Sequence, residues 1–115
     1  MAYHILISEN NSPEDMVFDH YLGSAQSIDF YWEEVGRKLG LSIISSITER
    51  ADSEDGFVLE GEKLKEFARE LVKFEEYWNQ QSTTMDLPAN FLNDLNSIKI
   101  ATELAVAKGL KLMIG

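Results

Sequence analysis

The chain has 115 residues and no cysteine, and its 20 acidic and 10 basic side chains give a formal net charge of −10. The length fits a single domain spanning residues 1–115, and the lack of cysteine excludes disulfides, thiol catalysis and cysteine-ligated zinc while suiting a reducing compartment. No apolar run approaches the roughly 20 residues of a membrane span, and the first ten residues contain no Lys or Arg. We therefore expect a cytoplasmic protein without a membrane segment or a secretory signal.

The negative charge is concentrated in the first third of the chain. Residues 1–36 hold seven acids and no Lys or Arg, whereas residues 37–115 hold thirteen acids and ten bases. Binding to a nucleic-acid backbone or to an anionic membrane requires clustered cations, so both are disfavoured. A one-signed surface favours a basic protein partner, and solubility alone is the alternative explanation.

The first half of the chain predicts a strand followed by a helix. Residues 3–8 are short, apolar and rich in β-formers, and the run "MVFDHYL" is compatible with a second strand before a turn at "GSAQS". A helix is predicted from an N-cap at Ser27 to Gly40, because apolar side chains recur at helical spacing. Those side chains are Ile28, Tyr31, Trp32, Val35 and Leu39.

The middle of the chain predicts a loop and then a long helix. Residues 41–47 are ambiguous, and the spacing of their apolar side chains favours a helix. Residues 52–61 read as a loop with a short extended piece at 57–59. Residues 61–80 form the strongest amphipathic pattern, in which Ala68 and Val72 widen the stripe. Its central positions are Leu64, Phe67, Leu71, Phe74 and Trp78.

The last third of the chain predicts a helix and a terminal strand. Asp86 and Pro88 have the chemistry of a helix start, and Gly109 that of a helix end. Phe91, Leu95, Ile98, Thr102 and Ala105 mark the predicted inner face, and residues 110–114 alternate as a strand does. The sequence therefore predicts an α+β fold, with about three amphipathic helices packed on a small sheet that includes the N-terminal and C-terminal strands.

The acidic stretch of residues 52–60 fails as a calcium loop. An EF-hand requires oxygen ligands at positions 1, 3 and 5, Gly at position 6 and Glu at position 12. Counting from Asp52 puts Phe57 at position 6 and Lys63 at position 12, and counting from Ala51 removes the first ligand. Three readings stay open: a solvated loop, a weak cation site formed by Asp52, Glu54 and Asp55, and a docking patch for a basic partner.

Signatures of catalysis and of cofactor binding are missing from the sequence. His4 and His20 have no His or Glu partner at helical spacing, so each is expected to be structural. The chain contains no G-x-S-x-G, no G-x-G-x-x-G and no P-loop motif. We predict no catalytic residue, no metal and no cofactor, and lean towards a protein that is not an enzyme.

In its second half, the chain resembles the small immunity proteins of bacterial toxin systems. The resemblance rests on the style of "LEGEKLKEFARELVKFEEYW" and "LNDLNSIKIATELAVAKGLKLMIG" in a short, acidic, cysteine-free chain. It implies a non-enzymatic inhibitor that masks the basic surface of a toxin with its own acids. The contact residues implied are Asp52, Glu54, Asp55, Glu60, Glu14 and Asp15.

Two other functions stay open. A small-ligand-binding protein or enzyme would have a sizeable pocket between the sheet and the helices, with polar groups around His20, Tyr21 or Tyr31. A homo-oligomer would expose an apolar patch on the helix of residues 62–80. The sequence leaves undecided the partner, the oligomeric state, the strand order and the conformation of residues 41–50.

Overall fold

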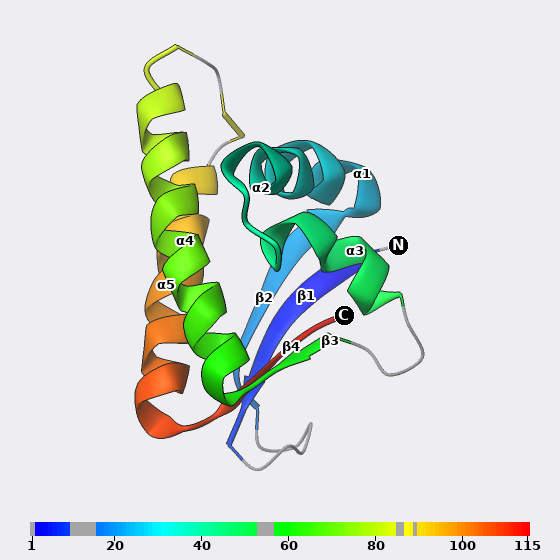
Figure 1. Ribbon diagram of the computed structural model, residues 1–115, viewed down its shortest axis with the longest axis vertical. Helices are drawn as coiled ribbons and strands as arrows, with labels where there is room; N and C mark the ends of the chain where they lie inside the picture. Colours follow the sequence, from blue (N-terminus) through cyan, green and yellow to red (C-terminus); the bar gives the residue numbers. More distant parts are fainter. Residues whose placement is uncertain (1, 10–15, 53–56, 85–86, 89) are drawn as a thin grey trace.

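A computed structural model describes residues 2–9, 16–52, 57–84, 87–88 and 90–115. The predicted α+β class is confirmed: helices pack on a four-stranded antiparallel sheet of order β2-β1-β4-β3. The strands are β1 (Ala2–Ser8), β2 (Met16–Ser24), β3 (Phe57–Leu59) and β4 (Lys111–Ile114). The sheet includes both terminal strands, as predicted. They pair with each other at its centre, and β2 and β3 are its edges (Figure 1).

One face of the sheet is covered by helices. Alternate residues of β1 and β4 point into the core, where Ile5 pairs with Ile114 and Ile7 with Leu112. The two long helices α4 (Gly61–Gln81) and α5 (Phe91–Lys108) lie side by side, and the shorter helices cover the rest of this face (Figure 1). These elements enclose a single cluster of buried apolar side chains.

The first helical region starts earlier than predicted and is interrupted. It consists of α1 (Ala25–Ile28), a π-helical turn η2 (Asp29–Glu33) and α2 (Glu34–Leu39). Ser24, not Ser27, is the N-cap, and its hydroxyl accepts the amide hydrogen of Ser27 at 3.2 Å. The helix ends at Gly40 as predicted, in a left-handed conformation with φ +73°.

The inner face of this helical region differs from the prediction at three positions. Glu33 and Gly36 are buried, while Leu39, predicted to be on the inner face, is exposed. The sequence pattern was therefore wrong at Leu39, the last residue of α2, although Val35 one turn earlier is buried as predicted.

The ambiguous residues 41–50 are largely helical. A short 3₁₀ turn η3 (Ile44–Ser46) leads into α3 (Ile47–Ala51). Leu41, Ile44 and Ile47 are all buried, as their spacing favoured, and Ile43 is buried with them. The short extended piece at residues 57–59 is confirmed as β3.

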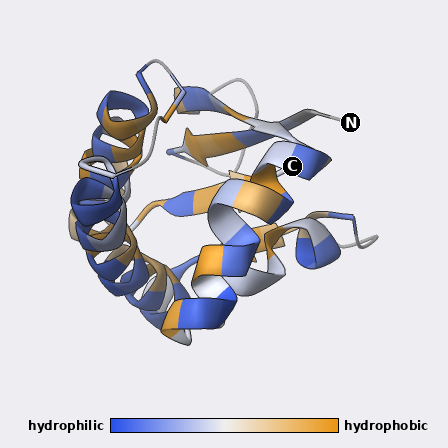
Figure 2. Ribbon diagram, turned by 90° about the horizontal axis from the view of Figure 1, so that it is seen from above, coloured by the Kyte–Doolittle hydropathy of each residue, from blue (hydrophilic) through white to orange (hydrophobic). Residues whose placement is uncertain are grey.

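The two long helices are confirmed with small differences. All five predicted core positions of α4 are buried, and hydrophobic and hydrophilic residues alternate along the helix ribbons in Figure 2. Val72, predicted to widen the stripe, is exposed. Helix α5 begins at Phe91, after an N-cap at Asn90 with φ +66°, so Pro88 precedes the helix instead of occupying its first turn. Asp86 lies outside the described residues.

Candidate functional site

The six predicted contact residues come from two different stretches of the chain, and the structure describes two of them, Asp52 and Glu60. Asp52 follows α3 and Glu60 precedes α4, so they bracket the edge strand β3. Glu54 and Asp55 fall in the chain between them, outside the described residues. Glu14 and Asp15 also fall outside, in the connection between β1 and β2, and β2 is the opposite edge of the sheet.

Asp52 is exposed at the surface, and its carboxylate also contacts a buried residue of the core. Its carboxylate accepts a hydrogen bond of 2.8 Å from the hydroxyl of Tyr3, which is buried on β1. This hydrogen bond, burial and the negative charges of Asp52 and Glu33 raise the pKa of Tyr3 above its ordinary value of 10.0. A change at Asp52 therefore alters core stability as well as surface charge.

The Tyr3–Asp52 hydrogen bond predicts a loss of stability at alkaline pH. Because the folded pKa of Tyr3 is raised, its stabilisation is fully present below pH 10.0 and is lost as pH rises through the folded pKa. In an absorbance titration of the four tyrosines we expect one to ionise late, and Asp52→Asn to return it towards the ordinary range. Tyr3→Phe should remove the late titration altogether. An unchanged titration in Asp52→Asn would contradict the assignment.

Glu60 is on the surface and forms an ion pair across the sheet. Its carboxylate lies 3.0 Å from the Nζ atom of Lys111, the first residue of β4, and both side chains are exposed. Exposed pairs of this kind contribute at most about 1 kcal/mol to stability. Glu60 is therefore available for an intermolecular contact at low cost to the fold.

Beside these two acids, the second face of the sheet exposes apolar side chains. Val58 of β3 pairs with Met113 of β4, and Met113 pairs with Leu6 of β1, so the three form one row across the sheet. Val58 is 48% exposed and Met113 is 41% exposed, because the helices cover the other face. Strand β3 has only three residues, so the alternation of apolar side chains along it is too short to predict this row from the sequence.

Two further carboxylates have structural roles that the sequence did not reveal. Glu33 is 5% exposed, and its carboxylate accepts hydrogen bonds from the hydroxyl of Thr48 at 2.7 Å and from its amide at 3.2 Å. Glu70 of α4 accepts the amide hydrogens of Ile43 and Ile44 at 2.9–3.2 Å. Both carboxylates satisfy backbone donors at the start of η3 and α3, where a helix leaves amides unpaired.

Each histidine lies beside one aspartate. The Nδ1 atom of His4 is 2.9 Å from Asp19 on the open face of the sheet, and the Nε2 atom of His20 is 3.7 Å from Asp94 of α5. Within the described residues, no group of three or more possible ligands is placed to hold a metal ion. The weak cation site considered for residues 52–55 falls mostly outside those residues.

Two hollows between the sheet and the helices, lined by described residues, are small. One beside His20, Tyr21 and Asp94 has a volume of about 40 Å³, and another between β2 and α5 has about 130 Å³. Ligand sites usually occupy 300–1,000 Å³, so neither is the sizeable pocket that a small-ligand function would need. Tyr31 instead packs against the rings of Trp78 and Phe91.

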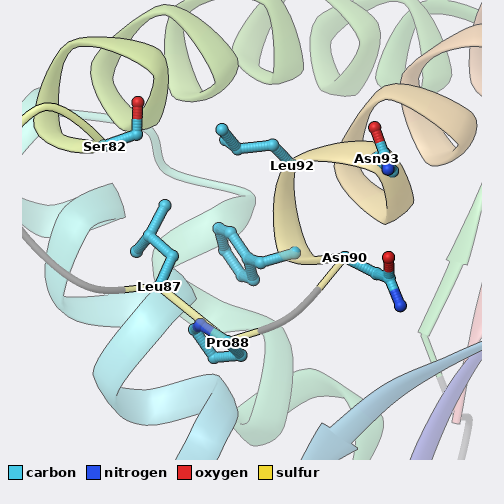
Figure 3. A pocket seen from close by; sticks show the side chains of 7 residues that line it. Ser82, Leu87, Pro88, Asn90, Leu92 and Asn93 are labelled. Carbon is cyan, nitrogen blue, oxygen red and sulfur yellow. The ribbon is translucent and has the colours of Figure 1, made fainter.

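Two larger hollows lie at the surface of the helical layer. One, of about 280 Å³, is at the junction of α4 and α5, where Leu87 and Leu92 extend into it (Figure 3). The other, of about 380 Å³, lies between α4 and the turn at Gly40. Arg69 and Lys73 line the second hollow together with Glu66 and Glu70, so its formal charge is balanced.

Comparisons with known proteins add no relative to this description: no family model, no curated protein and no solved structure matches the chain. Among the described residues, none of the helices combines the length and apolarity needed to cross a bilayer.

Proposed function

We propose that this chain is a non-enzymatic protein-interaction module that binds a basic protein partner through the β3 edge of its sheet. The observation that carries the proposal is the exposed pair Val58 and Met113, which lies in one cross-strand row with Leu6 on the face opposite the helices. Val58 and Met113 belong to neighbouring strands, so a partner can cover both at once. Protein interfaces typically place apolar side chains at the centre and polar ones at the rim.

The charge of the surrounding sequence supports a basic partner. Residues 52–60, which include β3, contain four acids and no Lys or Arg. The exposed carboxylates of Asp52 and Glu60 lie at the two ends of this segment. Opposite charges at the rim accelerate encounter and orient the partner, while the apolar centre retains it.

An immunity-type inhibitor is the sharpest form of this proposal. Such a protein covers the basic, substrate-binding surface of a toxin, and the formal net charge of −10 suits that role. The resemblance of the second half of the chain to small immunity proteins also supports this form of the proposal. The cysteine-free composition suits a cytoplasmic protein that protects the cell in which it is made.

The proposal is tested by retention of host proteins on the immobilised chain at low and high salt. Val58→Lys adds one positive charge in the row, and Glu60→Lys adds two at its rim. Val72→Lys and Glu76→Lys make the same changes at exposed positions of α4 and serve as matched controls. Tyr3→Phe separates the structural hydrogen bond of Asp52 from its charge.

We expect one basic protein to be retained at low salt by the wild type and by both α4 controls. Val58→Lys and Glu60→Lys should weaken its binding about ten-fold or more. If the retained protein is an enzyme, addition of one equivalent of this chain should inhibit it. The proposed surface would be overturned if the α4 controls weakened binding equally. It would also be overturned if none of the four substitutions changed the amount of protein retained.

A further inference from the structure

A second apolar surface lies far from β3, on the outer side of α5. Ile100 and Leu104 are one helical turn apart and are 54% and 52% exposed. Val17 of β2 is 55% exposed and lines the same hollow as Leu104. We call Val17, Ile100 and Leu104 the α5 patch. The homo-oligomer hypothesis expected such a patch on residues 62–80, but on α4 the large apolar side chain that is exposed is Val72.

The α5 patch combines a projecting side chain with a hollow. The hollow of about 130 Å³ is lined mainly by apolar side chains of β2 and α5. Glu9 and Lys108 also line it. Its apolar lining consists of Ile7, Val17, Phe18, Ala101, Leu104, Ala105 and Leu110. An apolar cavity of about 150 Å³ can hold a benzene-sized group, so this hollow can accept one aliphatic side chain.

The charge of α5 determines which occupant suits the patch. Helix α5 contains Asp94 and Glu103 against Lys99 and Lys108, so its formal charge is zero, whereas the whole chain carries −10. Lys99 forms an ion pair with Glu75 of α4, with 2.6 Å between its Nζ atom and the carboxylate. A neutral surface offers nothing to attract a basic partner. On such a helix, two copies of an acidic chain can approach with little local repulsion.

We propose that the α5 patch is the interface of a two-fold symmetric homodimer. A two-fold axis perpendicular to α5, midway between residues 100 and 104, places Ile100 of each copy opposite Leu104 of the other. Ile100 of one copy then lies opposite Leu104 of the other copy, which lines the hollow. The same contact is made in both directions, as a two-fold interface requires. The β3 edge of each copy stays free, because β2 and β3 are opposite edges of the sheet.

The test is the mass of the purified chain in solution as a function of protein and salt concentration. We expect concentration-dependent dimerisation to about twice the 13.1 kDa of one chain. Ile100→Lys and Leu104→Lys should each raise the dissociation constant at least ten-fold. Both positions are more than half exposed, so the variants should keep the circular dichroism and melting temperature of the wild-type monomer. Val58→Lys and Val72→Lys are the matched controls and should leave dimerisation unchanged.

Salt separates this interface from the proposed partner site. Added salt screens repulsion between the two acidic copies and should strengthen the dimer, whereas it should weaken binding of a basic partner. A chain that stays monomeric up to millimolar concentration would overturn the proposal. So would a dimer that survives Leu104→Lys, or one that is lost in Val58→Lys instead. The first two outcomes leave the proposed partner site untouched, whereas loss of the dimer in Val58→Lys would place self-association on the row of Val58 and Met113.

Discussion

Phe74→Ala is expected to lower the free energy of unfolding by about 3–5 kcal/mol, the usual cost of truncating a buried aromatic ring. Phe74 is fully buried on α4, and its ring forms a T-shaped pair with Trp32, with centroids 4.6 Å apart. It also lies 6.4 Å from the ring of Trp78. The truncation removes the contact of Phe74 with Trp32 in the first helical region and leaves a cavity behind. Urea denaturation monitored by tryptophan fluorescence measures the change.

Two further variants allow the prediction to be tested even if Phe74→Ala fails to fold. A domain of this size has only about 5–15 kcal/mol of stability, so Phe74→Ala leaves a small margin. Phe74→Leu retains most of the apolar volume and should cost clearly less while keeping the fold. Val72→Ala, two residues away on the exposed side of α4, should change stability by less than about 1 kcal/mol. A loss below 1 kcal/mol in Phe74→Ala would show that α4 does not pack through this face.

Gly36→Ala is expected to destabilise the protein by about 2 kcal/mol, although alanine is the better helix former. A Cβ atom at Gly36 would lie 2.8 Å from the backbone nitrogen of Ser45 and 3.0 Å from the Cγ2 atom of Ile44. The first is a backbone atom, so η3 would have to move away from α2. Overpacking of this kind costs about 1–3 kcal/mol or more, against a gain of about 1 kcal/mol in helix propensity.

The sign of the effect decides this second prediction. If η3 did not touch α2, Gly36→Ala would stabilise the protein by up to about 1 kcal/mol through helix propensity alone. Glu34→Ala, at an exposed position of the same helix, is the matched control and should lie within about 0.5 kcal/mol of the wild type. Thermal and urea unfolding of the three proteins, measured together, give the comparison.

The helices were predictable where a local pattern was long and uninterrupted. In α4 five apolar positions at spacings of three and four residues define one face, and all five are buried. The pattern was incomplete in the first helical region, where it wrongly placed Leu39 inside and where the π-turn at Asp29–Glu33 contains one extra residue. Nothing in a periodicity analysis marks that extra residue, because the turn depends on how the flanking segments pack.

The roles of individual acids could not be predicted from the sequence. Glu33 and Glu70 were counted only as charge, yet they bind backbone amides 15 and 26–27 residues away. Asp52 was predicted as a surface residue, whether solvated, in contact with a partner or in a weak cation site, and its carboxylate also accepts a hydrogen bond from the hydroxyl of Tyr3, 49 residues away. These partners are distant in sequence, so no local spacing reveals them.

The sequence by itself determined the α+β class, the position of the long helices, the terminal strands and the acid excess, because each depends on composition or short-range periodicity. Only the tertiary structure decided which surfaces are exposed. The row of Val58, Met113 and Leu6 and the α5 patch both join residues from elements far apart in the chain. Whether an apolar side chain belongs to the core or to an interface depends on which face of its element another layer covers. That coverage is a property of the assembled sheet and helices, and no local pattern contains it.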